Sequence, residues 1–307
     1  MKINFKHIRP ALIIVLSLVF VFSAFQLIRI LAGYRQGANE YDEAADLAGL
    51  PDLSALPLPT AGSPENTAEP AVSAPGEESN TPKPSFTPYI DPYADALKAM
   101  DFAALRQVNS DVLGWILIPD TFVSYPFLQG ADNDYYLDHT WRKTINSVGA
   151  IFMEQINSAD LSDFNTILYG HRMNNRSMFG ALQFFADQSY WAAHPYVYIT
   201  DDSGSRRYDI FAAYEVSTAG DTYRIGFSGD QDRQSFLDFC LAQSVIDTGV
   251  TPTVYDSILT LSTCTGSGHD TRWVVQAVHR NGPPVREEDP PVQAQEPEAS
   301  GPPVEEI

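Results

Sequence analysis

The chain opens on one long apolar run, and further on it alternates short apolar stretches with turn residues. The run from Ala11 to Ile28 is broken only by Ser17, Ser23 and Gln26. As a helix with a rise of about 1.5 Å per residue it would extend roughly 27 Å, close to the hydrocarbon thickness of a bilayer. It is longer than the apolar core of a usual signal peptide, and no Ala-x-Ala-like cleavage site follows it, so an uncleaved anchor is favoured over a removed signal.

Basic residues set the expected orientation of this anchor. Lys2, Lys6 and Arg9 precede the run, whereas Arg29 and Arg35 follow it and reduce the asymmetry. Because basic residues are retained on the cytoplasmic side, the balance predicts a single-pass protein of the cell membrane. Its N-terminus would be cytoplasmic, and everything after about residue 33 would be extracellular.

Two stretches have a composition that does not form a core. Residues 36–90 are rich in Pro, Ala, Ser, Glu and Thr, and the stretch from Asn281 to Ile307 holds three Pro-Pro pairs and many acids. Such segments cannot bury enough apolar surface to offset the entropy of ordering. We expect both to be disordered, and the first to act as a spacer that carries the folded domain away from the bilayer.

Short runs rich in β-branched and apolar residues lie between these stretches, and turn residues separate them. They predict strands at 114–118, 123–128, 149–154, 165–169, 196–200, 207–217, 257–263 and 273–279. Helical patches are expected at 133–140, 177–185 and 231–243, with a helical lead-in from Pro92. Many short strands without a βαβ alternation favour a mainly β barrel or sandwich.

Composition and charge then divide the chain. The expected parts are a cytoplasmic basic flank at 1–10, a transmembrane signal anchor at 11–33, a linker at 34–91, a catalytic domain at 92–281 and an acidic tail at 282–307. The net charge of −20 argues against a nucleic-acid partner, which would require a basic face. Residues 37–95 contain eleven acids and one Lys. Much of the negative charge therefore lies in solvated flanking segments and says little about the substrate.

The two cysteines have different surroundings. Cys264 ends the strand-like run 258–264 before a Gly-Ser-Gly loop, and Arg272 opens the next strand, whereas Cys240 lies among apolar residues at helical spacing. We expect Cys240 to be a buried helix residue. Neither cysteine belongs to a Cys-x-x-Cys pair or to a cluster with zinc spacing, so no metal site and no cofactor is predicted. A Cys240–Cys264 disulfide, which would silence the thiol, stays open for an extracellular protein.

A thiol at the end of a strand suits a nucleophile, because the loop gives access while the strand holds the sulfur still. An ordinary thiol, with a pKa of about 8.5, needs a basic or positive neighbour. Arg272 can supply charge but cannot take a proton, so His171, which follows a strand-like run and a glycine, is the candidate base. His269 is a weaker alternative. Taken alone, a Cys at a strand end is more often a small buried hydrophobe.

Several segments together closely resemble class B sortases. They are Thr-Leu-Ser-Thr-Cys at 260–264 with Arg272 downstream, Asn-Thr-Ile-Leu-Tyr-Gly-His at 165–171, Met-Phe-Gly-Ala-Leu at 178–182, Asn-Ser-Asp-Val-Leu-Gly-Trp-Ile at 109–116, and Leu-Gln-Gly-Ala-Asp-Asn-Asp-Tyr-Tyr-Leu at 128–137. The likeness runs from Tyr93 to Arg280 in the family's order. It implies a sortase-like closed β-barrel of about eight short strands with added short helices, after one transmembrane helix.

The resemblance also implies a membrane-anchored cysteine transpeptidase that attaches secreted proteins to the cell wall. By motif position, Cys264 is the nucleophile, His171 the acid/base and Arg272 the cation that supports the substrate carbonyl. The thiolate would cleave a C-terminal sorting signal of the Asn-Pro-x-Thr type after Thr, and an amine would resolve the thioester. The substrate-groove positions of the family fall on Asn133, Leu137, Ser262 and Thr263.

The implied partners are secreted proteins that bear a C-terminal sorting signal, a cell-wall precursor amine, and the lipid bilayer through residues 11–33. Two alternatives stay open. A pilin-polymerising sortase would use a Lys acceptor, and a catalytically silent, membrane-tethered sortase-like binding domain would have an unreactive thiol. The loop between Cys264 and Arg272 is shorter than usual in the family, which bears on substrate detail rather than on reaction type.

Overall fold

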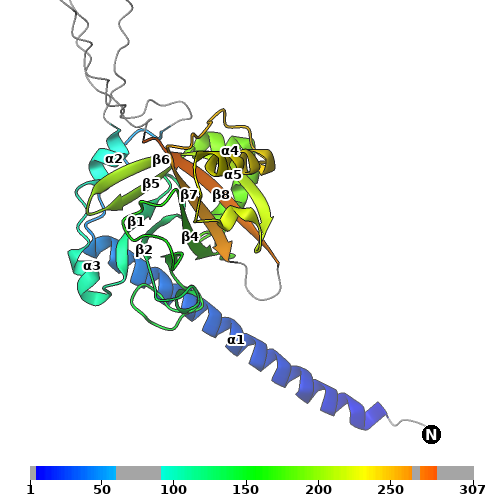
Figure 1. The fold of residues 1–307 in the computed structure, drawn as a ribbon. Helices are drawn as coiled ribbons and strands as arrows, with labels where there is room; N and C mark the ends of the chain where they lie inside the picture. The colour runs from blue at the N-terminus through cyan, green and yellow to red at the C-terminus, as the bar shows by residue number, and fades with distance from the viewer. Residues whose placement is uncertain (1–4, 60–90, 265–269, 282–307) are drawn as a thin grey trace, which may run out of the picture.

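The computed structural model describes residues 5–59, 91–264 and 270–281. Figure 1 shows them as a β-barrel from which one long N-terminal helix, α1 (Phe5–Leu47), projects. The tail predicted at 282–307 and residues 60–90 of the predicted linker lie outside the described residues.

Eight strands close into the barrel, and each coincides with a run that the sequence predicted. Their bounds are β1 Val112–Leu117, β2 Ser124–Leu128, β3 Ile151–Met153, β4 Asn165–His171, β5 Tyr196–Asp201, β6 Gly204–Ser217, β7 Ser257–Cys264 and β8 Thr271–His279. They are joined in the order β1-β2-β3-β4-β7-β8-β6-β5. The closed barrel confirms the predicted fold class.

Short helices connect the strands. Their bounds are α2 Pro92–Leu97, α3 Ala103–Val108, η1 Tyr135–Leu137, η2 Gly180–Ala186, α4 Gln188–Ala193, η3 Asp221–Tyr223 and α5 Asp230–Gln243. The lead-in and the three predicted patches correspond to α2, α3, η1, η2 and α5. The helices α4 and η3 were not predicted, because each is too short for a helical period to be visible in the sequence.

Strand direction decides where the ends of the strands meet. Strand β4 pairs with β7 in parallel, and β2 pairs with β3 in parallel, while the neighbours of β6 and β8 are antiparallel to them. Two parallel strands end at the same edge of a sheet and need a long crossover connection. The chain between β4 and β7 supplies that crossover with β5, β6 and α5. The last residues of β4 and β7 therefore lie side by side although they are far apart in sequence.

The barrel has two apolar cores. The interior holds residues such as Leu168, Leu261 and Val275, all fully buried. A second core lies under α5, where Phe236 and Cys240 pack against residues of β6 and β8. Cys240 is a buried free thiol, so the predicted buried helix residue is confirmed and the structure contains no Cys240–Cys264 disulfide. These cores pack on both faces of β7 and β8.

Helix α1 differs from its prediction at its C-terminal end. The sequence placed residues 34–91 in a disordered linker, but α1 continues without a break to Leu47 and packs on the barrel. Gly33, Gly37, Ala44 and Ala48 recur at helical spacing, and small residues at this spacing allow a close approach. A Cβ on Gly37 would lie 3.1 Å from Val148 Cγ2. Packing against the barrel outweighs the polar composition that favoured disorder.

Local hydrogen bonds end α1 in a defined way. Gly49 has a φ of +62°, and the N–H of Leu50 donates to Ala45 O at 2.9 Å. This is a Schellman C-cap, in which glycine takes the left-handed conformation at no steric cost.

The N-terminal part of α1 carries the apolar run. An 18-residue window within Leu12–Leu47 has a mean hydropathy of 2.4, and none of it is buried against the rest of the chain. The helix is long and apolar enough to cross a bilayer, by length and composition.

Candidate active site

The parallel register of β4 and β7 brings two of the predicted catalytic residues together. The ladder runs from Asn165 opposite Ile258 to His171 opposite Cys264. Residues paired in this way are neighbours on one face of the sheet. The backbone of Cys264 therefore lies beside that of His171 at the edge where both strands end, which is the juxtaposition that the sequence predicted for a thiol and its base.

The imidazole of His171 is held by a backbone carbonyl. Its Nε2 lies 2.5 Å from Leu137 O, at the end of η1. A carbonyl oxygen only accepts hydrogen bonds, so Nε2 carries a hydrogen in both the neutral and the charged imidazole. Nδ1 is then the ring nitrogen that this contact does not occupy.

Gly149 forms the surface behind this imidazole. A Cβ at Gly149 would lie 2.8 Å from His171 Cδ2 and 2.8 Å from Leu137 O, and the residue has a φ of +62°. Only glycine combines this backbone conformation with so close an approach. The sequence placed Gly149 at the start of a strand, whereas β3 begins at Ile151 because Gly149 belongs to the preceding turn.

Arg272 lies on the other side of Cys264. Strands β7 and β8 pair from Ser257 opposite His279 to Ser262 opposite Val274. Thr263 Oγ1 then exchanges hydrogen bonds of 3.2 Å with the backbone O and N of Trp273. Continuing this register by one residue places Arg272 opposite Cys264. The three predicted catalytic positions therefore form a row across β4, β7 and β8.

Contacts between side chains build a wall beside this row. Glu154 accepts from Asn133 Nδ2 at 2.7 Å and from Tyr169 OH at 2.9 Å. The Tyr169 ring stacks on that of Tyr223, with 6.3 Å between the centroids, and Tyr223 OH lies 3.0 Å from Ser262 Oγ. Asn133 and Ser262, which the sequence predicted as groove residues, thus belong to one connected cluster of side chains, in which Ser262 itself is fully buried. Its other members were not predicted.

Hydrogen bonds from Asn165 fix the loop that carries Tyr223. Asn165 Nδ2 donates to Thr222 O at 3.1 Å and to Arg224 O at 2.8 Å, and Asn165 Oδ1 accepts from Thr260 Oγ1 at 2.7 Å. These groups are buried, where a satisfied polar network is rigid. The wall therefore has a fixed geometry beside the strand ends.

The side chains of the remaining predicted groove residues are buried or packed within the barrel. The Thr263 side chain is fully buried and bonded to the backbone of Trp273. Leu137 contributes the carbonyl that holds His171, while its side chain packs partly buried against the barrel core. The alternative base His269 lies outside the described residues.

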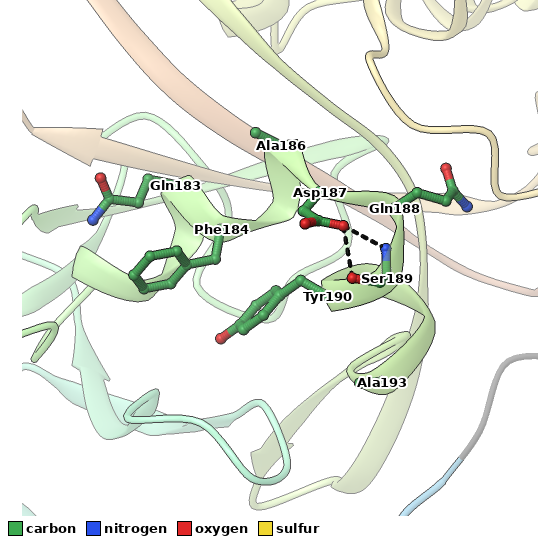
Figure 2. A pocket seen from close by; sticks show the side chains of 8 residues that line it. All are labelled: Gln183, Phe184, Ala186, Asp187, Gln188, Ser189, Tyr190 and Ala193. Carbon is green, nitrogen blue, oxygen red and sulfur yellow. Dashed lines mark hydrogen bonds between the residues drawn. The ribbon is translucent and has the colours of Figure 1, made fainter.

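An open hollow on another part of the surface is unrelated to these strand ends. It is lined by η2 and α4, and Figure 2 shows the rings of Phe184 and Tyr190 at one side and Asp187 bonded to Ser189 at the other. None of its lining residues comes from β4, β7 or β8. The bonded pair is the N-cap of α4, which is a structural role.

Alkylation should distinguish the two thiols. Cys240 is fully buried, and burial raises its pKa to about 11, so very little of it is thiolate at pH 8. We expect iodoacetamide to add one group to the native chain, at Cys264, and a second only in denaturant. Intact-mass and peptide mass spectrometry measure both. Native Cys264→Ala should take up none, and rapid labelling of native Cys240 would contradict the prediction.

A closed β-barrel with a thiol and an imidazole at paired strand ends and an arginine beside them defines a class of cysteine-dependent acyl-transfer enzymes. The family model described as the Sortase domain matches residues 116–280. Sortase B of Staphylococcus aureus is 36% identical over 170 residues, 55% of this chain and 70% of that protein. Sortase B of Listeria monocytogenes is 38% identical over 162 residues, 52% of this chain and 65% of that protein.

Solved structures of sortase B also match this chain. A crystal structure of S. aureus sortase B and its substrate complex each match with a TM-score of 0.57 and 36% identity, over 58% of this chain and 86% and 84% of those chains. The chain belongs to the sortase family, and within it resembles class B. It is accordingly a sortase-type cysteine transpeptidase.

Proposed function

We propose that this protein is a membrane-anchored transpeptidase that cleaves a C-terminal sorting signal after Thr and joins the secreted protein to a cell-wall amine. The observation that carries the proposal is the pairing of His171 with Cys264 at the ends of β4 and β7. A reacting carbonyl can approach a strand edge, and the two groups that must exchange a proton are neighbours there.

In the first half-reaction, the Cys264 thiolate attacks the carbonyl carbon of Thr in the sorting signal. The C–N bond to the next residue breaks, and the imidazolium of His171 gives the proton at Nδ1 to the leaving amine. The product is a thioester between the Thr acyl group and Cys264. Because Nε2 stays bonded to Leu137 O, the ring keeps its orientation while Nδ1 gains and loses its proton.

In the second half-reaction, an amine attacks the thioester carbonyl and its proton passes to Nδ1 of His171. The thiolate leaves, and a new amide joins Thr to the acceptor. Arg272 supports both steps, since its planar, permanently charged donors can stabilise the oxyanion that forms on the carbonyl oxygen.

The connected wall of Asn133, Glu154, Tyr169, Tyr223 and Ser262 is the proposed groove for the sorting signal. Tyr169 and Ser262 are paired on β4 and β7 two residues before His171 and Cys264, so a peptide lying along this wall would present its carbonyl to the thiol. The S. aureus relative has been solved as a substrate complex, which supports a substrate-binding role for a protein of this fold.

The proposed location is the outer face of the cell membrane. The apolar part of α1 would cross the bilayer once, with Lys2 and Lys6 on the cytoplasmic side. The carbonyl of Gly33 accepts a hydrogen bond of 3.0 Å from Asn146 Nδ2, so the barrel contacts α1 directly after the apolar run. The barrel would therefore lie at the bilayer surface and not at the end of a long spacer.

A two-substrate assay tests the proposed reaction. The full-length chain in detergent micelles is mixed with a library of sorting-signal peptides and with a triglycine amine, a cell-wall stem peptide or a pilin-type Lys peptide. We expect a Cys264-dependent peptide joined through Thr to a wall-type amine, detected by mass spectrometry. A product formed only with the Lys peptide would instead favour a pilin polymerase, and no product from a folded chain with a reactive thiol would favour a silent binding domain.

A further inference from the structure

We propose that helix α1 supports the catalytic centre directly: its Tyr41 is a positioning residue, which orients His171 through Gly149. The proposal extends the proposed function and rests on it, because an effect of Tyr41 on kcat presupposes that reaction. The orientation of His171 relative to Cys264 also determines thiol reactivity, which is measurable without a substrate.

Among the described residues, the hydrogen bonds and the ion pair that join α1 to the barrel go to one segment, residues 140–149, which leads into β3. Glu40 O accepts from Trp141 Nε1 at 2.7 Å, and Glu43 forms an ion pair of 2.6 Å with Arg142. These contacts and the hydrogen bond from Asn146 to Gly33 follow the helix over several turns. The 140–149 segment thus has α1 on one side and, at its end, the active site.

Tyr41 makes the contact that reaches the imidazole. Its hydroxyl donates a buried hydrogen bond of 2.6 Å to Gly149 O, and its side chain is only 6% exposed. Gly149 is the residue whose Cα lies behind the His171 ring, close to Leu137 O. Fixing the carbonyl of Gly149 therefore fixes the surface against which the imidazole rests.

A second route leads from the same side chain to the turn after His171. The Tyr41 ring lies edge-on to that of Tyr125, with 5.1 Å between the centroids. Tyr125 OH accepts a hydrogen bond of 3.0 Å from the N–H of Met178. The next residue, Phe179, donates its N–H to His171 O at 3.0 Å. Tyr41 therefore supports His171 from behind the ring and from its backbone.

This arrangement also relates the active site to the bilayer. Tyr41 lies eight residues beyond Gly33 on one helix, which corresponds to about 12 Å along its axis. The helix is continuous between the apolar run and Tyr41. The residue that supports His171 therefore lies on the same continuous helix as the apolar run, a short distance beyond its end.

The test compares two substitutions in the interface between α1 and residues 140–149. Tyr41→Phe removes only the hydroxyl that binds Gly149, and Glu43→Gln removes the charge that pairs with Arg142 in the same interface. Both full-length variants are studied in detergent micelles, at a temperature where circular dichroism shows them folded. The readouts are kcat and KM for peptide cleavage, and the pH dependence of Cys264 alkylation.

For Tyr41→Phe we expect kcat to fall about tenfold at unchanged KM, and the alkylation midpoint to move to higher pH because the thiolate loses a well-placed imidazolium. Glu43→Gln should change either quantity less than about twofold. Wild-type values for Tyr41→Phe, or equal losses in both variants, would overturn the proposal. If wild-type Cys264 alkylates but no peptide is cleaved, the proposed function fails, and the alkylation profiles still decide whether Tyr41 positions His171.

Discussion

Arg272→Lys is expected to lower kcat/KM for acylation of Cys264 by about two to three orders of magnitude. Continuing the register of β7 and β8 places the backbone of Arg272 opposite that of Cys264, and in the proposed mechanism its guanidinium stabilises the oxygen on which negative charge develops. Loss of one such donor typically costs about 3–4 kcal/mol of transition-state stabilisation. Lysine keeps the charge but lacks the planar, paired N–H donors of a guanidinium. It is therefore a poor replacement where hydrogen bonds must hold a carbonyl, or two oxygens, in a fixed orientation.

Steady-state peptide cleavage and thermal unfolding together check this prediction. Arg280→Lys is the matched control, because Arg280 follows the same strand and pairs with Asp256 at 3.1 Å, away from the strand end that carries Cys264. The control should keep its kcat/KM. Arg272→Lys should also unfold within a few degrees of wild type, since Arg272 is partly exposed. Retained activity in Arg272→Lys would show that charge alone suffices there.

A chain that begins at Asp91 is expected to be both unstable and poorly active. Without α1, the barrel loses the buried side chain of Tyr41, and Trp141 Nε1 loses its acceptor. Loss of one buried aromatic side chain alone costs about 3–5 kcal/mol, which corresponds to a fall in Tm of about 6–20 °C for a domain of this size. The activity should fall as well, because Gly149 loses the hydroxyl that fixes its carbonyl.

Differential scanning calorimetry and peptide cleavage measure these effects, with a chain that begins at Gly33 as the control. That chain keeps the part of α1 that contacts the barrel and loses the apolar run. We expect it to retain the Tm and the kcat of the full-length protein. Equal stability and activity for the two truncated chains would mean that α1 is only a tether.

The barrel and its row of catalytic positions could be predicted from the sequence. The strands are β-branched and apolar runs bounded by turn residues, and this signal is local. Cys264, His171 and Arg272 each stand where such a run ends or begins, so their place at strand edges was also visible. Their adjacency was not contained in the local pattern, because it depends on the parallel pairing of β4 with β7 across a long crossover. The family resemblance supplied that information.

Helix α1 beyond Gly33 could not be predicted from composition. Residues 34–47 are polar and acidic, and that composition is typical of disorder. The stripe of Gly33, Gly37, Tyr41, Ala44 and Ala48 was the available signal, but small residues at helical spacing indicate a buried face only when a partner is known. That partner, the 140–149 segment, lies about a hundred residues further along the chain, as the contact of Tyr41 with Gly149 illustrates.

The wall beside the catalytic row escaped prediction for a similar reason. Asn133 and Ser262 were identified from the resemblance, whereas Tyr169 and Tyr223 look like ordinary aromatic residues of a strand and a loop. Their rings stack, and their hydroxyls reach Glu154 and Ser262, only because the fold brings these segments together. Single residues of this kind carry no local signal, because their role is set by which strands become neighbours.

The central claim is that Cys264 becomes acylated by a sorting signal, and intact-mass spectrometry tests it most directly. The full-length chain is incubated with a sorting-signal peptide and no amine, and is then treated with hydroxylamine. The account predicts an adduct with the mass of the peptide up to Thr, located on Cys264, released as a hydroxamate and absent from Cys264→Ala. A folded chain whose Cys264 alkylates but is acylated by no peptide, or an adduct that persists in Cys264→Ala, would contradict it.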